Sequence, residues 1–160
     1  MPLSPFEAHS VSPFNQQQFL AFVREQAALG RIDMDEEQIA TLRVLLVDAS
    51  EGQAWLLTRD GVACGFAVCG FLLSVAVQGR IAVFDYLEVT AREEALLAWA
   101  TLLAQIEDDL QTLDIHQMVL EVRSGEADKH QVMDQRDYSP SEPLVMRKPL
   151  RGNRDFKVRL

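Results

Sequence analysis

Two carboxylates, Asp85 and Glu88, lie in an apolar segment over residues 80–89 whose side chains alternate as in a β-strand. A carboxylate whose pKa is raised toward neutrality by burial can act as a general base and take a proton from an amine. Strict alternation places Asp85 and Glu88 on opposite faces of the strand, which excludes a carboxylate pair. Each residue therefore has two interpretations. Either it is a base, or it is an ordinary acid, with Asp85 hydrogen-bonded in a backbone turn and Glu88 facing solvent.

A long amphipathic helix is predicted after this strand, from Thr90 to about Leu113, and a second strand is predicted over residues 116–123. In such a β–α–β unit the helix N-terminus lies beyond the carboxyl end of the first strand, where open sheets bind ligands and phosphates in particular. Thr90 and Glu93 have the spacing of a capping box, in which each side chain bonds the other residue's backbone amide. The helix is therefore expected to satisfy its own first turn, and a phosphate site there is the alternative.

The rest of the chain supplies the neighbours of this unit. Asp60-Gly61 is a strong signal for a two-residue hairpin turn, and Gly65 and Gly70 predict a bulge or bend in the second arm of that hairpin. The other predicted strands cover residues 6–11, 53–59, 62–77 and 144–147. The other predicted helices cover residues 15–30, capped by Asn15, residues 33–49, capped by Asp33 with Glu36, and residues 126–136.

The central strand ends in Asp85, Leu87 and Val89, which have the spacing Asp-x-Leu-x-Val. With the order of elements around it, this strand resembles that of the GNAT superfamily of N-acetyltransferases. The resemblance follows the element order over residues 6–148 and is close in sequence only across 79–122. It implies an α/β (α+β) fold, with a mixed, mostly antiparallel central sheet flanked by helices and a central β–α–β unit.

In that family a loop of the form Arg/Gln-x-x-Gly-x-Gly/Ala opens the helix and holds the pyrophosphate of acetyl-CoA. The matching positions here are residues 94–99, and they include Ala95. Glu94 stands in place of the basic or amide residue, and Leu97 and Trp99 stand in place of the glycines. Glycines let a backbone approach a phosphate closely, whereas acidic side chains repel it. Trp99 is expected to pack in the core, and the loop is expected to be degenerate.

Two further positions differ from the family. The resemblance places Glu126 where an Asn is usual and Met133 where a Tyr serves as the general acid that reprotonates the CoA thiolate. Tyr138 matches the aromatic residue of a closing Gly-Phe pair, with Asp137 in place of the glycine. The positions that carry chemistry in the family have therefore changed.

Two functions follow from the resemblance. The first is a GNAT-like protein with lost or atypical acetyl-CoA catalysis, which acts without a cofactor as a binding or regulatory module. The second is an active N-acetyltransferase that moves acetyl from acetyl-CoA to a cationic amine or a protein amino group. Its pantetheine arm would pair with the backbone at Leu87 and Val89, Arg92 would reach a phosphate, and Asp85 or Glu88 would be the base. A third hypothesis is a structural protein whose acidic surface masks a basic partner.

Composition limits these hypotheses. The chain has 160 residues and a net charge of −9, and residues 147–160 carry six basic residues and one acid, so the rest is strongly acidic. An acidic body disfavours nucleic acid and favours a small-molecule amine or a basic protein as partner. We expect one domain over 1–148 with a basic tail over 149–160, a cytoplasmic location and no membrane span. The resemblance, in addition, implies a possible homodimer. The acidic run over residues 107–109 is interpreted as a solvated face, with a partner-facing surface as the alternative.

The cysteines and histidines indicate no metal site. Cys64 and Cys69 lie five residues apart in one predicted strand, about 16 Å at about 3.3 Å per residue, too far for a disulfide. The three histidines are scattered, without the close spacing of metal ligands. Two buried free thiols are expected, which suits a reducing compartment.

Overall fold

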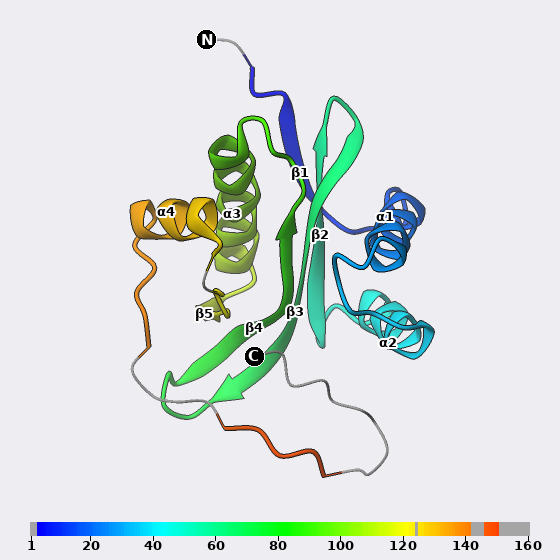
Figure 1. Cartoon of the computed structure of the whole chain (residues 1–160). Coiled ribbons are helices and arrows are strands. Elements are labelled where there is room, and N and C mark those ends of the chain that lie inside the picture. The colour runs from blue at the N-terminus through cyan, green and yellow to red at the C-terminus, as the bar shows by residue number, and fades with distance from the viewer. Residues whose placement is uncertain (1–2, 124, 142–145, 151–160) are drawn as a thin grey trace.

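The computed structural model describes residues 3–123, 125–141 and 146–150, and its centre is one curved five-stranded sheet (Figure 1). The strands lie in chain order and pair antiparallel, except for the parallel pair of β4 and β5. The elements are β1 (Phe6–Ser10), α1 (Gln16–Ala28), α2 (Glu36–Val47), β2 (Gly52–Arg59), β3 (Val62–Ser74), β4 (Gly79–Val89), α3 (Ala95–Thr112), β5 (Ile115–Val119) and α4 (Ala127–Gln135). Helices α1 and α2 cover one face of the sheet, and α3 and α4 lie on the other (Figure 1). The predicted fold class is confirmed.

Each face of the sheet has its own apolar core. On the side of α1 and α2, Phe66 is fully buried with Phe19 and Phe22 edge-on against its ring. On the side of α3, Trp55 stacks on Phe84, and the apolar stripe of the helix closes over them. The helical spacing predicted both stripes, because residues three and four apart share one face of a helix.

The hairpin between β2 and β3 forms as predicted. Asp60 and Gly61 have φ values of 48° and 82°, as a tight two-residue turn requires. A β-bulge follows, because Thr58 pairs with Ala63 but Leu57 pairs with Gly65. The predicted irregularity at Gly65 is confirmed. A Cβ there would lie 2.9 Å from the Glu88 carbonyl oxygen, so glycine lets β4 approach closely.

A second bulge lies in β4 itself, at Asp85. Tyr86 pairs with Val68 and Phe84 with Cys69, which leaves Asp85 without a partner on β3. The extra residue interrupts the alternation, so Phe84 and Leu87 both lie in the core beneath α3, while Tyr86 packs in the core on the other side. The strict alternation expected along residues 80–89 was therefore wrong at Asp85.

Two predicted helix starts were also wrong. Helix α2 is capped by Asp35, whose carboxylate accepts from the Gln38 amide in a capping box, two residues later than predicted. Helix α3 begins at Ala95 because Thr90 continues the sheet. The amide and hydroxyl groups of Thr90 both donate to the Cys64 carbonyl, at 2.8 and 3.1 Å. The capping box expected at Thr90 and Glu93 does not form.

The predicted last strand is only partly within the described chain. Leu144 and Val145 lie outside the described residues, and Met146 and Arg147 are not in a strand. Arg147 instead forms an ion pair with Glu121. The predicted basic tail lies mostly outside the described residues.

The acidic run near the end of α3 is structural. Asp109 accepts a hydrogen bond of 2.9 Å from the indole of Trp55, and Glu107 accepts two from Arg136 and one from the Tyr138 hydroxyl. The interpretation as a plain solvated face was wrong for Glu107 and Asp109, whose partners lie far away in the sequence. It holds for Asp108, which is exposed.

Both cysteines are free, and Cys69 is buried while Cys64 is half-buried. Burial raises the pKa of Cys64 to about 11 and that of Cys69 to about 12. Because the thiolate is the reactive form, we predict that neither thiol reacts appreciably with Ellman's reagent at pH 8 in the folded protein. Both should react once the chain is unfolded in urea. Rapid labelling of either cysteine under native conditions would contradict this prediction.

Candidate functional site

A pocket of about 390 Å³ opens at the carboxyl end of β4. It is bounded by the end of α1 and the segment after it, by the connection from β4 to α3, and by the start of α4. Its lining residues are Gln26, Arg31, Ile32, Glu88, Val89, Thr90, Ala91, Arg92, Ala95, Trp99 and Asp128. Glu88, Val89, Arg92, Ala95 and Trp99, which sequence analysis placed at a site, therefore lie together.

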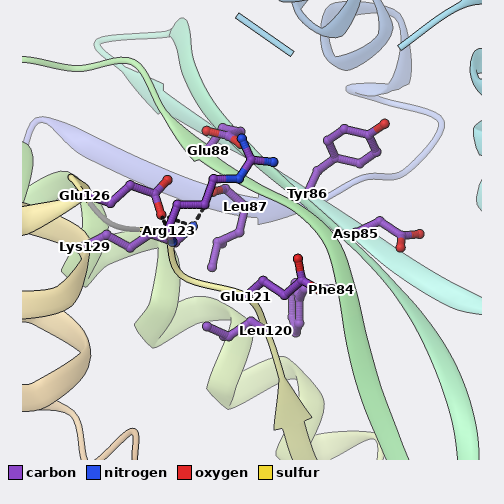
Figure 2. A pocket seen from close by; sticks show the side chains of 10 residues that line it. All are labelled: Phe84, Asp85, Tyr86, Leu87, Glu88, Leu120, Glu121, Arg123, Glu126 and Lys129. Carbon is purple, nitrogen blue, oxygen red and sulfur yellow. Dashed lines mark hydrogen bonds and ion pairs between the residues drawn. The ribbon is translucent and has the colours of Figure 1, made fainter. Parts of the chain in front are cut away.

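A second, narrower pocket of about 50 Å³ lies beside it, between β4 and the segment after β5 (Figure 2). The two strands pair as far as Val83 and Val119, where β5 ends while β4 continues to Val89. Beyond this point the backbone of β4 has no strand partner on that side among the described residues. This separation of the strands exposes the edge of β4 that includes Leu87, where the resemblance places a pantetheine arm.

Lys129 fills this separation. Its ammonium group donates a hydrogen bond of 3.2 Å to the Leu87 carbonyl and lies 3.6 Å from a carboxylate oxygen of Glu126 (Figure 2). It also lies 5.2 Å from the centre of the Trp99 ring, a cation–π contact. The residue is only 4% exposed. Lys129 thus binds the Leu87 carbonyl, part of the backbone with which the pantetheine arm was expected to pair.

The first turn of α4 positions Lys129. Glu126 is the N-cap residue, and its carboxylate accepts a hydrogen bond of 2.8 Å from the Arg123 amide, which fixes the turn before the helix. Lys129 follows three residues later, on the same side of the helix as Glu126. The sequence signal was weak, because a lysine in a polar segment ordinarily faces solvent.

Glu88 is the better placed of the two candidate bases. It is half-buried and lines both pockets, whereas Asp85 is exposed on its bulge and lines only the narrow one. Burial raises the pKa of Glu88, the nearby charges of Lys129 and Arg123 oppose this rise, and Glu126 adds to it. Although Asp85 is exposed, neighbouring protein atoms remove part of its hydration, which raises its pKa against the charge of Arg147. Only Glu88 faces the larger pocket.

The loop positions of the resemblance have distinct surroundings. Trp99 is 7% exposed and packs in the core as predicted, while Leu97 is 40% exposed. Glu94 has φ 55°, gives no side-chain cap to α3, and forms an ion pair of 3.0 Å with Arg59. The repulsion expected from Glu94 is therefore partly neutralised, and this N-cap residue leaves the first turn of α3 without its side-chain cap.

Two arginines give the larger pocket positive charge. Arg31 donates a hydrogen bond of 3.2 Å to the side chain of Gln26, which is itself 3% exposed. Arg92 is exposed and, among the described residues, forms no ion pair. Arg92 could be singled out from the sequence. Gln26 and Arg31 could not, because they belong to no motif and reach the pocket through the packing of α1 on the sheet.

The family's general acid has no counterpart in this geometry. Met133, at the position of the acid, is 4% exposed and packs in the core. Tyr138 donates its hydroxyl hydrogen to Glu107 at 2.9 Å, and burial together with the charge of Glu107 raises its pKa far above its ordinary value. Neither residue can deliver a proton to the larger pocket, which neither of them lines.

The raised pKa of Glu88 predicts a pH dependence of stability. A carboxyl group that binds its proton more tightly when folded makes folding more favourable as pH falls through the raised value toward the ordinary 4.5. We therefore expect wild type to gain stability relative to Glu88→Gln between pH 7 and pH 4.5, measured by urea unfolding. Glu93→Gln, at an exposed position, is the control. A constant or reversed difference would contradict the prediction.

Neither a metal site nor a membrane span is evident in the described parts of the chain. No group of three or more His, Cys, Asp or Glu side chains there is arranged to hold a metal ion. No described helix combines the length and apolar character needed to cross a bilayer.

The comparisons with known proteins rest on structure. No family model and no characterised protein matches the sequence. An integron cassette protein from the mobile metagenome of Cole Harbour Salt Marsh has a TM-score of 0.73 at 15% identity, over 91% of each chain. AAC(6')-Iy, solved with the bisubstrate analogue CoA-S-monomethyl-acetylneamine, has a TM-score of 0.69 at 13% identity, over 90% of this chain and 97% of its own. A predicted acetyltransferase from Clostridium acetobutylicum, solved with acetyl-CoA, has a TM-score of 0.65 at 12% identity, over 89% and 96%.

These likenesses define the fold as that of the GNAT N-acetyltransferases. The mixed, curved sheet and the helix between the parallel strands β4 and β5 agree with it. Since every identity quoted is below 25%, the shared property is the fold, and the activity depends on the residues of the site.

Proposed function

We propose that this chain is a GNAT-fold protein that has lost ordinary acetyl-CoA catalysis and works as a binding or regulatory module. The position of Lys129 carries the proposal. Its ammonium group bonds the Leu87 carbonyl, the backbone group to which the resemblance assigns the pantetheine arm. A cofactor arm in that place would have to displace a buried cation from both Leu87 and Trp99.

The loop and the missing acid support the same proposal. Leu97 and Trp99 replace the loop glycines, and Trp99 is part of the core, so the backbone there is not open to a pyrophosphate. Met133 and Tyr138 are both engaged in packing or hydrogen bonds elsewhere. The acidic body favours a cationic amine or a basic protein as the partner of such a module.

The alternative is an active N-acetyltransferase, and one observation favours it. The N-cap residue Glu94 gives helix α3 no side-chain cap, and Arg92 lies nearby, so the first amides of the helix can donate hydrogen bonds to an anion. In this alternative the amine of the acceptor attacks the thioester carbon of acetyl-CoA, a C–N bond forms and the C–S bond breaks. Glu88 takes the amine proton, and water protonates the departing thiolate.

An acetyl-transfer assay separates the two functions. Release of CoA thiol from acetyl-CoA is followed with diamines, amino sugars and peptides with free N-termini as acceptors. We expect release no faster than the uncatalysed rate with every acceptor. Turnover that disappears in Glu88→Gln and persists in Glu93→Gln would contradict the proposal and establish the alternative.

A further inference from the structure

The larger pocket has charges of both signs, and loss of acetyl-CoA catalysis does not explain them. Arg31 and Arg92 reach it from the segment after α1 and from the connection between β4 and α3, while Glu88 and Asp128 reach it from β4 and α4. Trp99 contributes an apolar wall between these elements. A site left over from binding an anionic cofactor would be expected to keep cations alone, whereas this pocket has two cations and two anions.

Arg31, one of the two cations that line the pocket, is held in place. The Arg31 amide donates to the Gln26 carbonyl at 3.0 Å, and the Arg31 guanidinium donates to the Gln26 side chain at 3.2 Å. Because Gln26 is 3% exposed, it anchors the guanidinium to the core. The other guanidinium N–H groups suit a carboxylate, whose two oxygens match the planar fork.

The two carboxylates that line the pocket come from β4 and α4. Glu88 is half-buried at the end of β4, with Lys129 and Arg123 near enough to act on its charge and Glu126 as a like-charged neighbour. Asp128 adds a second carboxylate from the first turn of α4. Together these two carboxylates provide acceptors for an ammonium group, the donor that most requires paired acceptors when it leaves water.

We propose that this pocket binds a small zwitterion, a molecule that carries both an ammonium group and a carboxylate, such as a free amino acid or a longer amino carboxylate. The volume of about 390 Å³ is at the lower end of the range for small-molecule sites, about 300–1,000 Å³. A zwitterion meets both pairs of charges, whereas a simple anion or a simple cation leaves one pair unmet. This inference rests on the proposed function, because Ala95 and Trp99 of the loop line the same pocket.

The test is a thermal-shift and calorimetric titration of the full chain with α-amino acids and ω-amino carboxylates. Each compound is matched by its N-acetyl form, which lacks the ammonium group, and by its amide, which lacks the carboxylate. We expect at least one zwitterion to bind, and both of its blocked forms to bind at least about tenfold more weakly, since a hydrogen bond to a charged group is lost in each.

Variants locate the site. Arg31→Gln and Glu88→Gln should each weaken binding of that zwitterion by about tenfold or more. Arg43→Gln, at an exposed position of α2, and Asp108→Asn, at an exposed position of α3, are matched controls and should bind as wild type does.

Three results would overturn the inference: no zwitterion binds at millimolar concentration, a blocked form binds as well as its parent, or Arg31→Gln and Glu88→Gln leave binding unchanged. Acetyl-CoA is titrated in the same series. If neither acetyl-CoA nor any zwitterion binds, the inference fails and the proposed function stands. If acetyl-CoA binds and no zwitterion does, both fail.

Discussion

Trp99→Ala should lower the free energy of unfolding by about 3 kcal/mol, the lower part of the range for removing a large aromatic side chain from a core. The ring is 7% exposed and packs among the α3 core residues, but it also borders the larger pocket, which keeps the loss from being greater. In a thermal melt this corresponds to a fall of about 6–12 °C in the midpoint for a chain of this size.

Leu97→Ala is the control for Trp99→Ala. It is also at a family glycine position, but its side chain is 40% exposed, so its loss should have a much smaller effect. Because Trp99 is part of the core, we also predict that a chain carrying Glu94→Arg, Leu97→Gly and Trp99→Gly is destabilised and does not bind CoA. A triple variant that folds stably and binds CoA would show that Trp99 is not a core residue.

Lys129→Ala should lower the free energy of unfolding by about 2 kcal/mol, because it removes a hydrogen bond from a charged donor to the buried Leu87 carbonyl. The cation–π contact with Trp99 is lost as well, and Glu126 loses its partner. Without the charge of Lys129, the pKa of Glu88 should rise further. Urea unfolding and an NMR titration of the Glu88 carboxyl measure the two effects.

Lys129→Met separates charge from volume. Methionine keeps most of the apolar stem, so it should restore the packing against Trp99 but not the hydrogen bond to Leu87. We expect its stability to lie between those of wild type and Lys129→Ala, with the pKa of Glu88 raised in both variants. A pKa of Glu88 that is the same in all three chains would show that Lys129 does not act on it.

Much of the fold could be predicted, because its signals are local. The Asp60-Gly61 turn is encoded in two residues, and the apolar stripes of α1 and α3 follow from helical spacing alone. The parallel arrangement of β4 and β5 follows from the long helix between them. These features do not depend on contacts between residues that are far apart in the sequence.

The features that were missed depend on distant partners. The bulge at Asp85 arises from the pairing with β3, and no local signal marks it. The capping pattern at Thr90 is sound locally, but the Cys64 carbonyl binds that threonine and extends the sheet. Glu107 and Asp109 appeared solvated, since their partners lie 29 to 54 residues away.

The residues of the candidate site also fall into two groups, those that a local sequence signal marks and those that it does not. Glu88 and Arg92 could be singled out, because they flank the end of a predicted strand in a β–α–β unit. Arg31 and Lys129 could not, because Arg31 reaches the site through the packing of α1 on the sheet and Lys129 through the packing of α4. The altered loop and Met133 could be identified from the sequence, whereas Lys129, whose position carries the proposed function, could not.

The central claim, that Lys129 and the altered loop exclude acetyl-CoA, is tested most directly by calorimetric and thermal-shift titration of the wild-type chain with acetyl-CoA at near-physiological salt. The account predicts no heat of binding and no change in the midpoint at millimolar ligand. The contradicting result is saturable binding: ligand at a hundredfold over its dissociation constant would add about 2.7 kcal/mol of stability, a rise of about 5–10 °C.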